Sequence, residues 1–300
     1  MRRTRIVAAA AGVVLMAGLT ACGSDGDGGG DKGGEGGGKK AGGSPAQSAL
    51  AALKTASTTT EQQKSARVDG DQKQTVQGQA MNSTNKGSFD WSEGGMTGKA
   101  EITMQGGAAM GAGNKPMQAR YLPDAMYIQM AAGAAQGKWI EYDYDVLAKK
   151  AGPSGAYMKD QIQNNNPARS VQLLMATGKV KAVGSESVRG VKATHYTGDV
   201  KLSELTRMQS KDLSESDLQA LEQQFQQQGL TKERIDLWID DKDLLVKKRE
   251  TAKNKQGTTS VDNTVYYTDY GTDVNVSEPS GAVSFEKMMS GGAGAGSGAS

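Results

Sequence analysis

The chain has 300 residues, and 35 lysines and arginines stand against 33 aspartates and glutamates, for a formal net charge of +2 at pH 7. Charges of both signs are mixed along the chain and aromatic residues are scarce, which argues against the basic, aromatic face of a nucleic-acid-binding protein. One histidine and one cysteine argue against a zinc site. We therefore expect no metal, no cofactor and no nucleic-acid partner.

Residues 1–21 have the layout of a lipoprotein signal peptide. Three arginines within the first five residues precede an apolar run, 6–19, that is too short to span a membrane comfortably. The run ends in LTAC, which resembles the bacterial lipobox and predicts that Cys22 is the lipidation site. Acylation there followed by cleavage before Cys22 would leave two or more acyl chains, each buried methylene contributing about 0.8 kcal/mol to membrane binding. The general secretory and twin-arginine export routes both stay open.

The two ends of the mature chain are rich in glycine. Residues 22–43 predict an acylated cysteine followed by a flexible tether with an end-to-end distance of about 25 Å. Residues 290–300 predict a disordered tail of glycine, serine and alanine. Between them, 44–289 is long enough for a single domain.

The first part of this domain predicts one helix and then strands. Ser44, Pro45 and Gln47 form an N-terminal capping pattern ahead of a short helix. Alternation with turn residues between runs then predicts an antiparallel meander through 66–81, 87–92, 96–105, 118–131 and 137–145. Within it, the sequence AMYIQM places Met126, Ile128 and Met130 on one face.

The second part predicts two capped helices and further strands. Asn166 and Ser214 are the expected N-caps, and the helices end near Gly178 and Gly229. Strands are predicted at 179–188, 192–202, 233–241, 244–253, 258–271 and 274–279. In the run RIDLWID, three aliphatic residues share one face and Trp238 lies on the other. This order predicts an α+β fold in which several helices cover one face of a large antiparallel sheet.

Catalytic signals are weak. The one histidine, His195, lies in the middle of a predicted strand, where it is more typical of structure than of catalysis. Acidic clusters at Asp143 and Asp145, and at 240–243, fall where strands end and are typical of turns. No nucleophile elbow and no metalloprotease motif is present. We predict that the protein is not an enzyme.

Methionine is unusually frequent, with 14 residues against three phenylalanines. Two interpretations stay open. Methionine fills irregular gaps in an ordinary core, and the same softness suits it to flexible apolar ligands such as acyl chains.

Several motifs together resemble one family. The lipobox, the tether, VRGVKATHYTGDV, IDLWIDDKDLLVKKRE and the closing YTDYGTDVNVSEP are similar to the actinobacterial LppX/LprAFG lipoproteins, over residues 46–280. The resemblance implies a curved antiparallel half-barrel like that of the LolA and LolB carriers, with helices over its concave face around an apolar cavity. It also implies a lipid or lipoglycan ligand and an anchored position at the outer face of the cytoplasmic membrane.

The leading hypothesis is a non-enzymatic lipoprotein that binds or transfers lipid. Face alternation and helix stripes alone give the predicted cavity lining: Met126, Ile128, Met130, Trp139, Leu174 and Met175. A sheet rich in glutamine, lysine and glycine is compatible with a small or absent cavity. The alternatives are a ligandless interaction or sensor module that binds an envelope protein partner, and a cell-wall enzyme.

Overall fold

The computed structural model describes residues 44–92, 95–106, 114–133, 135–209 and 213–288. The predicted signal peptide, the lipidation site Cys22, the tether and the tail 290–300 lie outside these ranges. No helix within them is long and apolar enough to cross a membrane.

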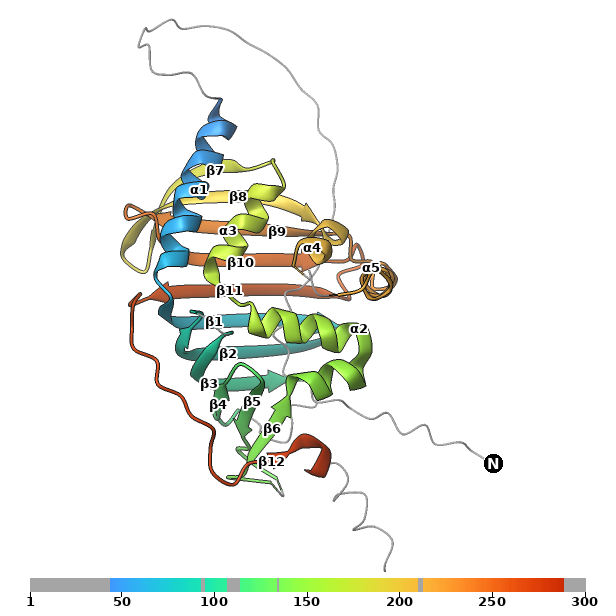
Figure 1. Cartoon of the computed structure of the whole chain (residues 1–300). Coiled ribbons are helices and arrows are strands. Elements are labelled where there is room, and N and C mark those ends of the chain that lie inside the picture. The colour runs from blue at the N-terminus through green and yellow to red at the C-terminus, as the bar shows by residue number, and fades with distance from the viewer. Residues whose placement is uncertain (1–43, 93–94, 107–113, 134, 210–212, 289–300) are drawn as a thin grey trace, which may run out of the picture.

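One open sheet of twelve strands forms the body of the molecule (Figure 1). The strand order is β12-β6-β5-β4-β3-β2-β1-β11-β10-β9-β8-β7, and every neighbouring pair is antiparallel except β12 with β6. The first six strands are β1 Ser65–Val76, β2 Gln79–Asp90, β3 Thr97–Gly106, β4 Met117–Tyr121, β5 Ala125–Gln129 and β6 Trp139–Asp143. The others are β7 Lys181–Val188, β8 Val191–Lys201, β9 Lys232–Asp240, β10 Leu245–Lys253, β11 Ser260–Thr268 and β12 Val283–Ser284.

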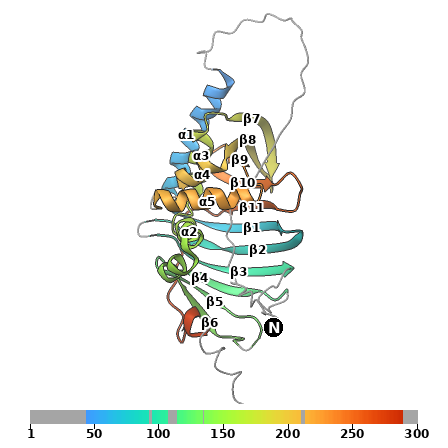
Figure 2. The same ribbon diagram turned by 90° about the vertical axis from the view of Figure 1, so that its right-hand side faces the viewer.

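Helices lie on one side of this sheet, as the two perpendicular views show (Figures 1 and 2). The helix α1 crosses strands β7 to β11 and packs beside α3, while α2 lies over β1 to β3. Their bounds are α1 Pro45–Gln62, α2 Tyr144–Gln163, α3 Pro167–Ala176, α4 Leu202–Gln209 and α5 Glu215–Gln227. The predicted α+β class and its helix-covered antiparallel sheet are confirmed.

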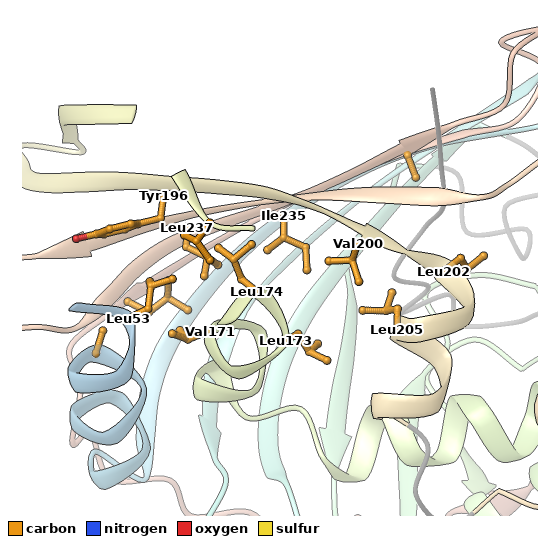
Figure 3. Packing of buried hydrophobic residues seen from close by; sticks show 14 of the residues in the cluster. Leu53, Val171, Leu173, Leu174, Tyr196, Val200, Leu202, Leu205, Ile235 and Leu237 are labelled. Atoms are coloured by element: carbon orange, nitrogen blue, oxygen red, sulfur yellow. The ribbon is translucent and has the colours of Figure 1, made fainter. Parts of the chain in front are cut away.

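The hydrophobic core is divided into two clusters. The first cluster lies between α1, α3, α4 and α5 and strands β8 to β11, and Figure 3 shows part of it around Leu53, Leu174 and Leu237. The second cluster joins strands β2 to β6 with α2. The clusters meet at the middle of the sheet, where β1 pairs with β11.

Capping explains the helix starts that the sequence predicted. Ser44 and Gln47 form the reciprocal capping box of α1, with the Ser44 backbone N–H donating to Gln47 Oε1 at 2.7 Å. Asn166 and Ser214 cap α3 and α5 as expected, because each side chain accepts a backbone N–H of the first turn. The predicted faces of β9 are also confirmed, since Trp238 lies apart from the core around Leu237.

Two predictions about strands were wrong. The run 66–81 is not one strand, because Gln77 and Gly78 both have positive φ and turn β1 into β2, which then includes most of 87–92. Residues 274–279 form no strand, although the Ser277 carbonyl accepts from Arg120 Nη1 at 2.9 Å. The edge of β6 pairs instead with Val283–Ser284.

Helices α2 and α4 were not predicted. The α2 sequence contains Gly152 and Pro153, and its backbone kinks at Gly152, where φ is 57°. These residues interrupt the helical pattern in the sequence. In the fold, the two halves of α2 are still held by burial of Tyr144, Tyr157 and Ile162 against the sheet and neighbouring helices.

We predict that Leu53→Ala lowers the free energy of unfolding by about 2–5 kcal/mol, because Leu53 is fully buried between α1 and the sheet. Urea unfolding followed by circular dichroism measures the change. The adjacent variant Lys54→Ala is the control, since Lys54 is exposed on the same helix. Equal stability of the two variants would show that α1 is not part of the core.

Candidate ligand-binding site

A cavity of about 120 Å³ lies at the seam between the two core clusters. Its floor consists of alternate residues of the central strands, and Gln161 of α2 and Asn165 of the turn after α2 line it from the helix side. The lining residues on the strands include Val68, Gly70 and Gln72 of β1, Ser83, Asn85 and Phe89 of β2, Ile102 and Met104 of β3, and Lys248, Glu250, Asn263, Val265 and Tyr267 of β10 and β11.

Gly70 leaves open space at the centre of this floor. It pairs with Asn85 on one side and Val265 on the other, and all three residues line the cavity. A Cβ atom at Gly70 would lie 3.8 Å from its nearest neighbour, which is ordinary van der Waals contact. A larger side chain there would therefore project into the cavity without backbone strain.

One end of the cavity is aromatic and contains unpaired polar atoms. The rings of Phe89 and Tyr121 lie 5.4 Å apart, and Trp91 and Met96 complete this end. Among the described residues, no hydrogen-bond partner exists for the buried Trp91 Nε1, Tyr121 OH or Asn85 Oδ1. Burial also raises the pKa of Tyr121. Buried polar atoms are normally paired, so this end has unused capacity for hydrogen bonds.

The other end is polar and internally paired. Lys248 Nζ lies 3.2 Å from both Glu250 Oε1 and Ser170 Oγ, and Asn263 Nδ2 donates to Glu250 Oε2 at 3.2 Å. Glu233 is buried close by, and its pKa is raised well above the ordinary value by burial and then by the charge of Glu250. The cavity is thus amphipathic along the strand direction.

A groove of about 510 Å³ adjoins the aromatic end, because Trp91 lines both spaces. The groove is formed by the end of α2, the α2–α3 turn, α3 and the last turn of α1. Arg169 Nη2 donates to Asp160 Oδ2 at 2.9 Å within it, and Asn164 Nδ2 donates to the same carboxylate at 2.8 Å.

Comparison with known proteins finds two relatives in Streptomyces. No family model matches the sequence. A 31.2 kDa protein from the rplA-rplJ intergenic region of Streptomyces griseus is 40% identical over 251 residues, which is 80% of each chain. The "Putative lipoprotein SCO4650" of Streptomyces coelicolor is 33% identical over 239 residues, covering 77% of this chain and 72% of that protein. The chain belongs to the family of these two Streptomyces proteins.

Solved structures similar to this chain include two mycobacterial lipoproteins. LppX of Mycobacterium tuberculosis has a TM-score of 0.49 at 13% identity, over 77% of this chain and 99% of its own. LprF of Mycobacterium bovis has a TM-score of 0.48 at 16% identity, over 80% of this chain and 100% of its own. Both are lipoproteins of the group that the sequence motifs resemble.

None of the six residues predicted to line the cavity is among its lining residues. Met126 and Ile128 are buried in the second core cluster, and Met130 packs at its margin. Leu174 is buried in the first cluster with Met175 beside it. Trp139 of β6 instead packs under the Arg120 guanidinium, 4.9 Å from its ring centre.

The reason for this difference is the width of the sheet. Strand β5 lies four places from β1, where α2 fills the space above it with Ile162, Leu147 and Met158. The cavity lies instead at the central strands, beneath the helices. The sequence could have indicated the central strands as the site. Gln72, Asn85 and Asn263 are polar residues at inward strand positions, where an ordinary core would be apolar.

The residues considered for catalysis make hydrogen bonds and ring contacts that stabilise the fold. His195 lies on β8, its Nδ1 3.0 Å from Glu186 Oε1 and its Nε2 2.9 Å from Asp236 Oδ1. Its ring stacks on Trp238 at 4.3 Å, apart from the cavity. Asp143 caps α2, and Asp240 accepts two backbone N–H groups of its turn, as predicted. Within the described ranges, no three acidic, histidine or cysteine side chains are grouped to bind a metal.

We predict that the Glu233→Gln variant gains stability relative to wild type as pH rises. The raised pKa means that the folded state holds the Glu233 proton more tightly than the unfolded state does. Wild-type stability therefore falls as pH rises from the unfolded pKa toward the folded one, by at most about 1.4 kcal/mol per pH unit. The amide has no such proton to lose.

Urea unfolding between about pH 5 and about pH 8 measures the free-energy difference between variant and wild type. The exposed Glu101→Gln is the control, and its difference should stay constant. A Glu233→Gln difference that did not grow with pH would contradict the raised pKa.

Proposed function

We propose that this chain is an exported, membrane-anchored lipoprotein that binds the apolar chain of a lipid in the cavity at the centre of its sheet. The observation that carries the proposal is the cavity itself, in which an open position at Gly70 lies between Asn85 and Val265, and Phe89 and Ile102 supply further apolar lining. A packed domain normally fills such space, and protein interiors keep few voids larger than a water molecule.

The dimensions of the cavity favour a small apolar segment. Its volume of about 120 Å³ corresponds to about four times the roughly 30 Å³ that one water molecule occupies in the liquid. Typical pockets for whole small molecules are larger, at about 300–1,000 Å³. The cavity therefore suits part of one acyl chain, with the rest of the lipid lying outside it.

The role that we propose is binding or transfer rather than catalysis. The only histidine of the chain is held between two carboxylates, and the charged pair in the cavity, Lys248 and Glu250, is joined within its own network. Anchoring by Cys22 through the tether 22–43 would hold the single domain 44–289 at the outer face of the cytoplasmic membrane. "Putative lipoprotein SCO4650" in the same family supports the anchor.

Filling the cavity should abolish binding. We expect Gly70→Leu to bind 1-oleoylglycerol at least about tenfold more weakly than wild type, because the leucine occupies the space that the chain would use. Native mass spectrometry of residues 44–300 with added lipid measures the bound fraction.

The matched control is Thr264→Leu, which adds a leucine to β11 between two lining residues and so on the opposite face. It should bind like wild type. Absence of lipid binding by the wild type would reject the carrier function and favour the module that binds an envelope protein partner.

The anchor is tested separately. We expect Cys22→Ser to move the protein from the membrane fraction to the soluble exported fraction, because serine cannot carry the thioether-linked lipid. Fractionation of the producing bacterium followed by immunoblotting measures the distribution. Retention of the variant in the membrane would contradict lipidation at this residue.

A further inference from the structure

The cavity and the groove are adjacent, and one ligand could extend from the groove into the cavity. Trp91 lines both spaces, and the turn between α2 and α3 places Asn165 at the cavity and Asn164 and Asn166 at the groove. The Trp91 indole N–H is buried without a partner among the described residues. A molecule that lies partly in each space would pass this ring.

The charges of the two spaces disfavour an anionic occupant. Lys248 and Arg169 are the cations among their lining residues, and each is paired with a carboxylate, Glu250 or Asp160. Glu61 at the end of α1 adds a third carboxylate, so the lining has one negative charge in excess. A phosphate would find both cations already paired and would meet a net negative lining.

The groove offers neutral hydrogen-bonding groups instead. Amide side chains line it at Gln163, Asn164, Asn166 and Gln172, with Trp91, Leu173 and Met208 as apolar surface. Gln163, Asn164 and Asn166 each use one amide atom within the fold. Their remaining donors and acceptors, with those of Gln172, are uncharged and suit hydroxyl or ester groups. The groove volume of about 510 Å³ is within the usual range for small-molecule sites.

We propose that the ligand is a lipid with an uncharged headgroup, which lies in the groove while a single acyl chain passes Trp91 into the cavity. This inference rests on the proposed function and assigns its ligand class. Headgroup selection then comes from the charge of the groove, and chain selection comes from the small volume of the cavity.

Two probes that share one chain test the headgroup. 1-Oleoylglycerol and 1-oleoyl-lysophosphatidic acid differ by a phosphate, and both can be added below the concentrations at which they form micelles. With the wild-type domain 44–300 at low ionic strength, we expect the phosphate-bearing probe to bind at least about fivefold more weakly. Equal or tighter binding of that probe would overturn the inference and leave the proposed function standing.

A charge reversal supplies the second test. Glu61 is exposed in the last turn of α1, where lysine is favoured by the helix dipole, so Glu61→Lys should fold normally. The variant gives the groove lining a net positive charge, and we expect it to bind the phosphate-bearing probe at least about threefold more tightly than wild type does, with 1-oleoylglycerol unaffected.

Glu101→Lys is the matched control, because it makes the same change of net charge at an exposed position of β3 that lines neither space. An equal gain with Glu101→Lys would show a general charge effect and contradict headgroup selection at the groove. Binding of neither probe to the wild type would instead count against the proposed function itself.

Discussion

The pairing of β1 with β11 is the constraint on which the rest of the structure depends. It joins residues 67–75 to residues 260–268 in an unbroken antiparallel register, so the first and last long strands of the domain become neighbours. All other strands follow from it as two meanders, one on each side. Each meander has its own core cluster, and the line between the clusters runs along this pairing.

The division of the core explains why space occurs at the seam. On the β1 side the inward row carries Gly70 between Asn85 and Val265, and large apolar residues resume only farther out. Helices pack tightly where they meet one meander, as α3 does on β8 and β9, but α2 bridges both. The two cores can each be well packed while the boundary between them is not, which confines the loss of packing to this boundary.

The outer face of the sheet supports the same seam from the other side. The His195 ring stacks on Trp238, the Lys247 ammonium lies 3.7 Å from the Trp238 ring centre, and the next residue in the row is Tyr266. Arg189, from the turn between β7 and β8, lies over the Tyr266 ring at 3.6 Å and pairs with Asp69 of β1 at 2.8 Å. This row of side chains runs from β8 over β9, β10 and β11 to β1. It gives the single histidine a structural role.

Local chemistry made much of the fold predictable from the sequence, whereas the site depended on a long-range pairing. Capping residues such as Ser44 and the alternation in β9 act within a few residues, so they could be read directly. The register of β1 against β11 spans nearly the whole domain and has no local signature. Without knowledge of this register, the sequence could indicate the inward face of β5, at Met126 and Ile128. It could not indicate where the helices leave a cavity over that face of the sheet.

The polar residues at the seam have a cost that an ordinary core would avoid. A buried donor or acceptor without a partner destabilises a fold by about 1–3 kcal/mol, and three such atoms lie at residues that line this cavity. An apolar residue in place of Asn85 would remove one unpaired atom. A larger side chain at Gly70, which the backbone permits, would fill the space. A sequence that keeps these features accepts lower stability at one place, which is the pattern expected of a binding site rather than of a core. The same reasoning separates the cavity from the His195 row, where both ring nitrogens are paired and nothing remains for a ligand to satisfy.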